Sequence, residues 1–569
     1  ANTVLRHNLG VVSIFWNTHR GSTQGEGLSK AKLNAMMGMF HDEANNTLIA
    51  DNFASGSERA GFSGVGVKCN STHAALHLLY GNEVSSSLNG YWIDHYNMAS
   101  LAGKGTCRAV TGMTAWKLNQ YGVYGEVIGT ETLKVIGMRV ADAAVGTYII
   151  MGGSGSKGHQ RDDKRVVVSD ALVVGFSDGN GNCEPSPISS HTCDFFMAWC
   201  GHVGPNAVGV RVANFVSGAN MAPGIKPWDD TGSYPSIYGQ TVISDSTFAN
   251  FGRPCTSGPR NNTRDVVFSV NPKSADANHP TSTSSIELVD VDPSSLFKIP
   301  PPNPNWINLA DCIDQDCDGP KHVLIRDEDG TVLGNFGGSV ISRGEVFSPN
   351  SFFGVPYNDE VNQPEGRSWW YENLPTVMRV DHLGNLLNVW DTWLGSGYGL
   401  SHGGNEPDNT CQLIPEWNAW RCEGEPHHRM LVIENLDADH EIRRISPVAI
   451  SSGDGHTDLM NGCMDHGWCF GYTCLKRLMT FWSIVSTNDD YTVHFTGSNP
   501  QALRLNLLHA REDGSELFVM KIYYRKSQRL QVFRNGQFVE DVNMHDGQYK
   551  SHLVRVGRWA PNDGADGYT

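Results

Sequence analysis

The feature of this sequence that most limits its fold is a loose theme that recurs throughout residues 1–295. A short apolar run leads to Asn or Asp, and a Gly with a second apolar pair follows, as in "TLIADNFASGSERAGF" and "KVIGMRVADAAVGTYII". The polar members of the theme recur every 23 to 37 residues, at Asn52, Asn82, Asn119, Asp142 and Asp170. Irregular steps of this length between short strands are typical of a solenoid whose rungs carry loop insertions.

The theme predicts a right-handed parallel β-helix with loop insertions over residues 1–295. Each rung of such a helix buries its inward-facing apolar residues, while Gly and Asn turn the corners because they accept positive φ. The 62 Gly, 26 Pro and 15 Trp agree with a turn-rich, all-β protein. An ordinary β-sandwich has similar short strands and turns, so it stays open as the alternative for this region.

The composition changes after residue 295. Four prolines stand within five residues of "KIPPPNPNW", and because proline cannot lie in a central strand, residues 296–311 are predicted to be a linker. A small β module is predicted for 312–400 and an antiparallel β-sandwich for 401–569. The sandwich prediction depends on alternating strands such as "YTVHFTG" and on Asp513-Gly514 and Asn535-Gly536, which are typical of hairpin turns.

Size and charge exclude several classes of protein. A chain of 569 residues exceeds what one hydrophobic core supports, so two or three domains are expected. The formal net charge is −17 and no dense basic run occurs, which argues against nucleic acid or an anionic membrane as the partner. No apolar run approaches the roughly 20 residues of a membrane span. The sequence lacks an initiator Met and a secretory leader, which fits a mature chain or a portion of a larger secreted or single-pass protein.

Cysteines and glycosylation sequons together indicate an oxidising, extracellular or cell-surface origin. The chain has 13 Cys, an odd number, so one thiol is expected to be free or paired outside the chain. Asn-x-Ser/Thr sequons lie at Asn45, Asn70 and Asn261. The candidate disulfide cysteines are Cys312, Cys317, Cys411, Cys422, Cys463, Cys469 and Cys474.

One acidic stretch, "DCIDQDCDGPKHVLIRDEDGTVLG", raises the question of a metal site. Asp314, Asp316 and Asp318 precede a Gly in the pattern D-x-D-x-D-G, which suits calcium because carboxylates gather on a tight loop. An EF-hand would need Glu at its twelfth position, where Ile325 stands, so only a looser calcium site stays open. The favoured interpretation is a turn closed by Cys312 and Cys317, followed by a hairpin at Asp329-Gly330.

No catalytic set emerges from the remaining motifs. The spacing of Cys463, His466, Cys469 and Cys474 is too wide for a paired zinc motif, so disulfides are favoured. The pair Asp465-His466 is interpreted as structural, and the adjacent His427 and His428 are predicted to lie at the surface. Nucleophile and phosphate-loop motifs do not occur. We therefore predict no catalytic residues and no cofactor other than the calcium left open above.

A series of long motifs carries a family resemblance. "NMAPGIKPW", "LIPEWNAWRCEG", "MLVIENLDADHEIRRISPVAI" and "DHGWCFGYTCLKRLMTFWSIV" occur in order, and the chain resembles the fibrocystin family over about residues 45–545, most densely over 311–535. The resemblance implies a parallel β-helix followed by β-rich modules within a very large extracellular protein. Members are surface proteins of cilia and other cell surfaces, without an established enzymatic activity. The G8 modules that accompany such β-helices are absent from this sequence.

Two functions follow as hypotheses. The first is a non-enzymatic, glycosylated scaffold, adhesion or coat component that contacts other surface proteins or copies of itself, and that assembles into a surface or ciliary filament. The alternative is a polysaccharide-binding or polysaccharide-degrading protein, because related β-helix proteins are associated with hyaluronan turnover. Aromatic runs such as "GRSWWYEN" could stack on glycans.

Overall fold

The structure is a computed structural model of the whole chain. It describes residues 3–13, 38–42, 47–57, 60–69, 79–93, 107–127, 132–151, 164–175, 177, 208–213, 239–252, 266–270, 279–299, 323–342, 351–352, 355–356, 377–380, 386–388, 410–436, 449–452, 457–459, 480–487, 489–496, 502–511, 515–523, 528–534, 537–544 and 549–555.

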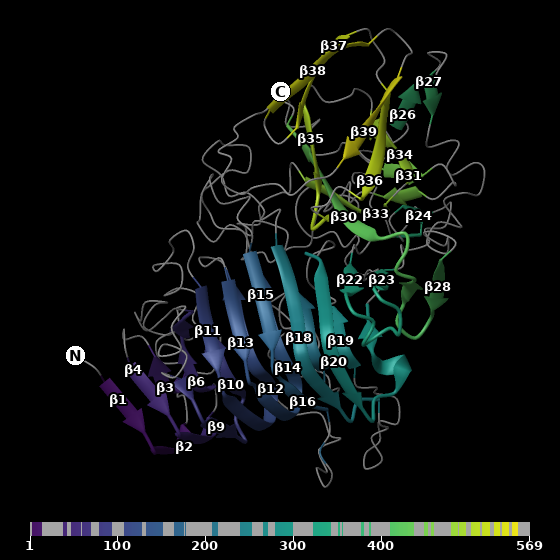
Figure 1. The fold of residues 1–569 in the computed structure, drawn as a ribbon. Helices are drawn as coiled ribbons and strands as arrows, with labels where there is room; N and C mark the ends of the chain where they lie inside the picture. Colours follow the sequence, from purple (N-terminus) through teal and green to yellow (C-terminus); the bar gives the residue numbers. More distant parts are fainter. Residues whose placement is uncertain are drawn as a thin grey trace.

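The N-terminal part of the chain is a parallel β-helix, which confirms the predicted fold (Figure 1). Each rung supplies a strand to each of three faces. The first face contains β1 (Thr3–Arg6), β4 (Thr47–Ala50), β8 (Leu79–Tyr80), β11 (Cys107–Thr111), β13 (Thr132–Ile136), β15 (Lys164–Ser169), the start of β18 (Gly239–Ala249) and of β20 (Thr281–Val289), and β22 (Leu324–Asp327).

The second and third faces repeat the same rung order. The second contains β2 (Leu9–Ser13), β5 (Phe53–Ser57), β9 (Asn82–Ser85), the start of β12 (Met113–Val127) and of β14 (Arg139–Met151), β16 (Leu172–Val174), and the ends of β18 and β20. The third contains β3 (Gly38–Asp42), β6 (Ala60–Gly64), β10 (Asn89–Ile93), the ends of β12 and β14, β17 (Val208–Ala213), β19 (Val266–Val270) and β21 (Phe297–Lys298).

The corner between the first and second faces is turned by one left-handed residue per rung. These residues have φ between +49° and +66° and follow one another along the helix: His7, Asp51, Gly81, Gly112, Gly137, Asp170, Asp245 and Ser285. A second column turns the next corner and includes Gly56, Ser86, Lys117, Asp142, Asn250 and Asp290. Gly and Asp tolerate positive φ better than most residues and hold most of these positions, which explains why Asp142, Asp170 and the glycines recur in the sequence theme. The asparagines of the theme, Asn52, Asn82 and Asn119, do not have positive φ.

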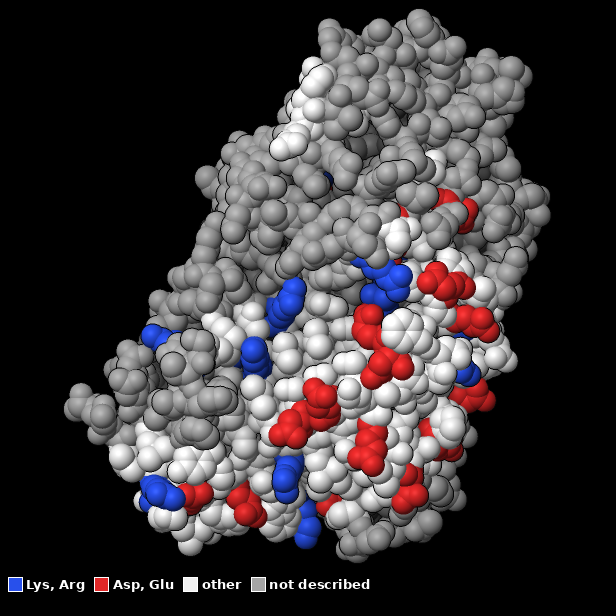
Figure 2. All heavy atoms as spheres, viewed as in Figure 1, with Lys and Arg blue, Asp and Glu red and all other residues white. Residues whose placement is uncertain are grey.

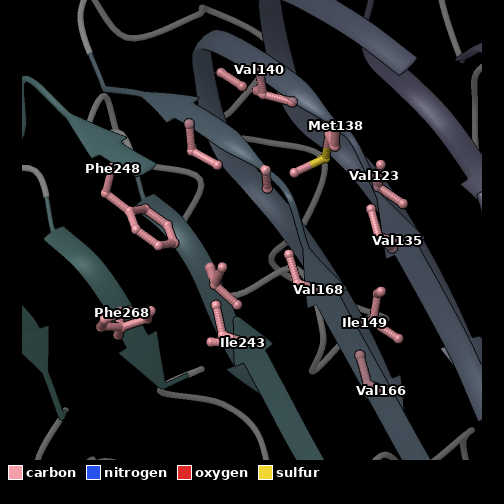
Figure 3. Packing of buried hydrophobic residues seen from close by; sticks show 14 of the residues in the cluster. Val123, Val135, Met138, Val140, Ile149, Val166, Val168, Ile243, Phe248 and Phe268 are labelled. Atoms are coloured by element: carbon pink, nitrogen blue, oxygen red, sulfur yellow. The ribbon is translucent and has the colours of Figure 1, made fainter. Parts of the chain in front are cut away.

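The core of the β-helix is one continuous apolar cluster. Val135, Val168 and Ile243 stack on the first face and meet Val140 and Phe248 from the second (Figure 3). The cluster extends from the N-terminal rungs to the residues that cover the C-terminal end, so neighbouring rungs share a core instead of forming separate ones.

A hairpin covers the C-terminal end of the helix. It is formed by β28 (Cys411–Ile414) and β29 (Ala419–Cys422), and β29 pairs with β23 (Ser339–Ser342) beside β22. Trp417 in its turn contacts the Phe297 ring edge-on, with centroids 4.9 Å apart, and its Nε1 donates to the Pro293 carbonyl at 3.0 Å. Pro293 begins the 3-10 turn η2 (Pro293–Ser295).

Strand pairing in the β-helix continues beyond residue 295. β21 and β22 lie in the ranges predicted as linker and small module, yet they pair in parallel with β19 and β20. The domain boundaries themselves stay a prediction. Short pairs complete this part: β7 (Val67–Lys68) lies antiparallel to β11, and β24 (Ser351–Phe352) pairs with β25 (Val355–Pro356).

The C-terminal part contains packed antiparallel sheets, as predicted. One consists of β33 (Thr480–Ser486), β30 (His428–Asn435) and β35 (Leu503–Leu507). The facing sheet contains β27 (Leu386–Asn388), β26 (Val377–Val380), β34 (Asp490–Thr496), β31 (Ala449–Ser452), β32 (Thr457–Leu459), β36 (Leu517–Tyr523) and β39 (Tyr549–Arg555). Within it β34 and β36 pair in parallel. β37 (Gln528–Arg534) and β38 (Gln537–Met544) form the hairpin predicted around Asn535-Gly536.

The hairpin predicted at Asp513-Gly514 is wrong, because the strands on either side belong to different sheets. β35 pairs with β30, whereas β36 pairs with β34 and β39. Leucines of β35 and Phe518 of β36 meet from opposite sides of one apolar cluster, so the chain crosses between the sheets here. In the described part of the chain, no helix has the length and apolarity to cross a membrane.

Candidate functional site at the junction of the β-helix and the sandwich

Most of the site residues predicted from sequence lie outside the described residues. These are Asp314, Asp316 and Asp318 of the calcium hypothesis, Cys312, Cys317, Cys463, Cys469 and Cys474, the pair Asp465-His466, and the sequons at Asn45, Asn70 and Asn261. Their predicted roles stay predictions. Among the described residues, a disulfide, buried histidines and a buried ion pair lie close together where the capping hairpin meets β30.

Two disulfides are present among the described cysteines. Cys411 and Cys422, both candidates from sequence, face each other on β28 and β29 and are joined across the hairpin. Cys69 and Cys107 form the second bond beside the β7–β11 pair. The candidate residues did not include Cys69 or Cys107, because a separation of 38 residues gives no local signal.

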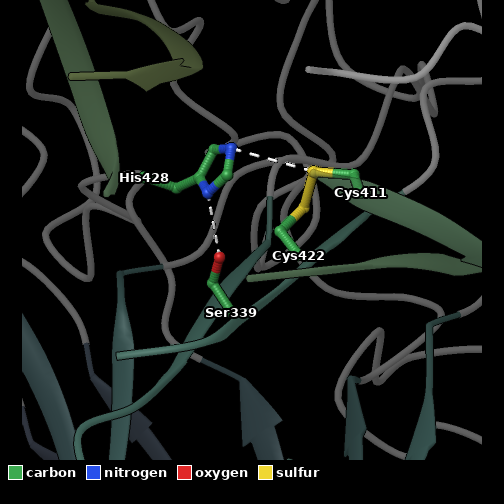
Figure 4. The surroundings of a disulfide bond; sticks show 4 residues. All are labelled: Ser339, Cys411, Cys422 and His428. Carbon is green, nitrogen blue, oxygen red and sulfur yellow. Dashed lines mark hydrogen bonds between the residues drawn. A yellow bond between two sulfur atoms is a disulfide. The ribbon is translucent and has the colours of Figure 1, made fainter. Parts of the chain in front are cut away.

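His428 connects the capping disulfide to the sandwich (Figure 4). Its Nδ1 lies 3.0 Å from Ser339 Oγ on β23, and its Nε2 lies 4.0 Å from Cys411 Sγ. His428 and His427 are 2% and 4% exposed, so their predicted surface placement is wrong. Adjacent strand residues do point to opposite faces, but both faces of β30 are covered, by the capping hairpin on one side and the facing sheet on the other.

The same residues form the one described group with metal-ligand spacing. The sulfurs of Cys411 and Cys422 and a ring nitrogen of His428 lie within 4.8 Å of one another, and all three residues are buried. A cysteine binds a metal ion such as zinc as its thiolate. In the disulfide the two sulfurs are bonded to each other, so the arrangement acts as a cross-link between buried strands.

A buried ion pair lies next to this cross-link. Arg429 Nε donates to Glu516 Oε2 at 3.0 Å, and Arg429 Nη2 pairs with the second oxygen of the same carboxylate. The backbone N–H of Arg511 also donates to Glu516, at 3.0 Å. Arg429 and Glu516 are 1% and 2% exposed, and because each charge has a charged partner, both tolerate burial.

The pKa values of two further groups, Arg326 and His427, are shifted by burial and by these charges. Burial lowers the pKa of Arg326 to about 10, and repulsion from Arg429 acts in the same direction. Burial also lowers the pKa of His427, assisted by repulsion from Arg511, although Glu425 lies 3.0 Å from its Nε2. Arg326 belongs to β22, whereas Arg429 belongs to β30. The charges of β22 in the β-helix and β30 in the sandwich therefore influence each other.

The β-helix end and the sandwich are joined here by the His428–Ser339 contact and by an apolar cluster in which Leu324, Ile341 and Trp420 pack with Met430. The disulfide lies within the capping hairpin, and the Arg429–Glu516 ion pair lies within the sandwich. These contacts place β30 against the covered end of the β-helix.

Comparison with known proteins places the chain in a family. It is 33% identical to human fibrocystin-L over 503 residues, covering 88% of this chain and 11% of that protein. It is 32% identical to mouse fibrocystin-L over 556 residues, covering 97% of this chain and 12% of that protein. Dog fibrocystin is 21% identical over 508 residues. No family model matches the chain. It spans about a tenth of the length of the curated relatives it matches, and it belongs to the fibrocystin family.

Proposed function

We propose that this chain is a non-enzymatic scaffold of an extracellular or cell-surface glycoprotein, where it serves as a stiff spacer between adhesion or coat partners. The observation that carries the proposal is the continuous core, which passes from Ile49 in the second rung to Trp417 in the capping hairpin. Stacked rungs that share a core resist bending, because a bend would have to separate strands along the whole cross-section. Two disulfides and three sequons support an extracellular, glycosylated setting.

The stiffness can be measured directly with two spin labels on the second face. Leu9 and Glu287 are exposed and occupy equivalent positions on the first and last of eight rungs. Seven rung steps correspond to about 34 Å between their Cα atoms. We expect a narrow distance distribution near this value from pulsed dipolar spectroscopy, with labels attached through a non-cysteine handle. A broad distribution spanning tens of ångströms would exclude a stiff spacer.

The non-enzymatic part of the proposal needs its own experiment. The purified chain would be incubated with extracellular polysaccharides, hyaluronan included, with and without calcium, while polymer length is followed. We expect unchanged polymers. Exposed corner residues such as Asp170, Asp245 and Asp290, and the acidic side chains on the visible face in Figure 2, would repel a polyanionic chain. Turnover that a chelator abolishes would favour the polysaccharide-degrading alternative and point to Asp314, Asp316 and Asp318.

A further inference from the structure

Three side chains with metal-binding atoms meet at the junction, and two of them form the capping disulfide. Cys411 and Cys422 face each other on β28 and β29, and His428 is the first residue of β30. The two sulfurs and a ring nitrogen lie within 4.8 Å of one another, and all three residues are buried. Cysteine thiolate and histidine imidazole are the ligands that zinc most often binds in proteins.

The His428 ring is already held in the orientation that a metal ligand needs. Figure 4 shows the ring between Ser339 and the disulfide, with Nδ1 3.0 Å from Ser339 Oγ and Nε2 4.0 Å from Cys411 Sγ. In the tautomer that carries its proton on Nδ1, this nitrogen donates to the Ser339 hydroxyl and the lone pair of Nε2 points toward the sulfurs. Metal-binding histidines in general bond their second ring nitrogen in this way, which fixes the tautomer and the ring orientation.

The distances suit a tetrahedral zinc site after small movements of the side chains. Zinc bonds of about 2.3 Å to sulfur and about 2.05 Å to nitrogen place two sulfur ligands about 3.8 Å apart and a sulfur and a nitrogen about 3.6 Å apart. The distance of 4.0 Å between His428 Nε2 and Cys411 Sγ exceeds this by only about 0.4 Å. The two sulfurs must separate from bonding distance, which rotation about the Cα–Cβ bonds of the two cysteines can supply.

Charge and burial also favour zinc at this position. Two thiolates and one neutral imidazole balance the charge of Zn²⁺, so the complex has no net charge. The surrounding cluster is apolar and includes Leu324, Ile341, Trp420 and Met430. A neutral complex is tolerated in such surroundings, whereas an unbalanced charge would be strongly disfavoured.

We propose that Cys411, Cys422 and His428 bind a zinc ion when the disulfide is reduced. A dithiol reductant supplies two electrons and two protons and becomes a disulfide itself, while the Sγ–Sγ bond breaks and two thiols form. Zinc binding then releases both thiol protons to solvent. No fourth His, Cys, Asp or Glu of the described residues joins the group, so a water molecule completes the tetrahedron.

The two states connect different parts of the molecule. The disulfide joins β28 to β29 within the capping hairpin, whereas zinc would also bond to His428 and so tie that hairpin to β30 of the sandwich. Reduction in the presence of zinc would therefore replace a cross-link inside one element by a cross-link between the two β-rich parts. The inference goes beyond the proposed function and does not depend on it, because it requires only the geometry of these three residues.

The experiment measures zinc binding by the reduced full chain. A phosphine reduces the protein without adding a competing sulfur ligand, and alkylation followed by peptide mass spectrometry verifies that Cys411 and Cys422 are thiols. Zinc is then titrated in competition with a chromophoric chelator. We expect the parent chain to bind one zinc equivalent more than the double variant Cys411→Ala with Cys422→Ala. The other cysteines are the same in both chains, so zinc that they bind cancels in the comparison.

Single substitutions test the assigned roles. His428→Gln removes a ligand and should weaken this equivalent by about a hundredfold, and Ser339→Ala, which removes only the hydrogen-bond partner of the ring, by about tenfold. Ser339→Thr keeps the hydroxyl and should restore the parent affinity. The matched control is His427→Gln, because His427 is also buried and adjacent in the chain but lies outside the group, and it should leave the affinity unchanged.

Amide hydrogen exchange shows whether the metal acts at the junction. Zinc should slow exchange in β28, β29 and β30 of the reduced parent and leave it unchanged in reduced His428→Gln. This readout also covers a junction that opens on reduction, since zinc would then restore the slow exchange.

Two results would overturn the proposal. One is a verified reduced parent that binds no more zinc than the double cysteine variant. The other is equal zinc affinity and equal slowing of exchange in the parent and in His428→Gln, which would show that the thiolates bind the metal without the histidine.

Discussion

Buried amides can stabilise a β-helix when every donor and acceptor is satisfied. Asn8, Asn52 and Asn82 of the first three rungs form a ladder, in which Asn82 Oδ1 accepts hydrogen bonds from the backbone N–H and Nδ2 of Asn52, and Asn52 Oδ1 accepts the same two from Asn8. Asn82 is fully buried and Asn52 is 1% exposed. Each also donates its Nδ2 to a carbonyl of the preceding rung, Asn82 to Ile49 at 2.8 Å and Asn52 to Leu5 at 3.0 Å. Leaving such groups without partners would cost much more than the modest net gain of making each bond. The ladder therefore enforces register between rungs.

Replacing Asn82 tests this enforcement. Asn82→Leu keeps the branched shape of the side chain but removes the acceptor of the Asn52 backbone N–H and the amide donor to the Ile49 carbonyl. We therefore expect a loss of about 2–4 kcal/mol in the free energy of unfolding, measured by urea titration. Asn8→Ala, at the exposed end of the same ladder, is the matched control and should cost about 1 kcal/mol or less. Equal losses for the two variants would contradict a register-enforcing role.

His427 should make stability depend on pH. Because burial lowers its pKa in the folded protein, the unfolded chain binds a proton below about pH 6.5 that the folded protein does not bind until lower pH. Stability is then lost as pH falls through this window. His427→Gln should reduce the slope of unfolding free energy against pH between 6.5 and 5 by up to about 1.4 kcal/mol per pH unit. Above pH 7.5 the two curves should run parallel, and identical slopes in the acidic range would argue against the effect.

At the scale of single strands, the third face has a constraint that the sequence theme does not reveal. Gly90, Gly122, Gly146 and Gly209 occupy equivalent positions on successive rungs. A Cβ on Gly122 would lie inside van der Waals contact with the Gly146 carbonyl and 2.7 Å from a methyl of Val140. The backbones of successive rungs lie so close together here that no side chain fits between them, and each position in this column therefore requires glycine.

Gly122→Ala should therefore destabilise the β-helix. The added methyl meets backbone that cannot move without disturbing the next rung, and overpacking of this kind costs about 1–3 kcal/mol. Gly10→Ala is the matched control, because the nearest atom to its new methyl would be the flexible Met39 sulfur at 3.1 Å. Thermal denaturation should show a clear drop for Gly122→Ala and little change for Gly10→Ala. The reverse order would show that the column is not tightly packed.

At the scale of the whole molecule, the capping hairpin decides whether the two β-rich parts behave as one. Its turn covers the end of the helix through Trp417, and its strands pack against Met430 and Val432 of β30. The Cys411–Cys422 bond closes this hairpin, with a sequence separation of 11 residues. Loss of the bond should loosen the junction before it affects distant rungs.

The double variant Cys411→Ala with Cys422→Ala should lower the free energy of unfolding by about 3 kcal/mol, as expected for a loop of this length. Hydrogen exchange should rise in β28, β29 and β30 in particular. The matched control removes Cys69 and Cys107, which lie in the N-terminal half of the helix and should leave exchange at the junction unchanged. Increased exchange at the junction in both double variants would show that the hairpin is not locally responsible.

The recurring sequence theme was sufficient to predict the β-helix, because successive rungs place polar residues at equivalent points. Asp142 and Asp170 turn corners with positive φ, whereas Asn52 and Asn82 bond to each other between rungs. The sequence also indicated the C-terminal sandwich, through strand alternation, and it included Cys411 and Cys422 among the disulfide candidates. These signals are local, since each depends on residues that are close in the chain.

The role of each polar residue depends on contacts between segments that are distant in the chain. Asp170 and Asp142 turn two different corners, Asn52 and Asn82 form a ladder inside, and Asn119 lies within β12 away from both columns. The tertiary structure likewise decided that His427 and His428 are buried and that Cys411 pairs with Cys422. Register between rungs 22 to 75 residues apart, and the covering of both faces of β30, depend on contacts between distant segments, which no local pattern encodes.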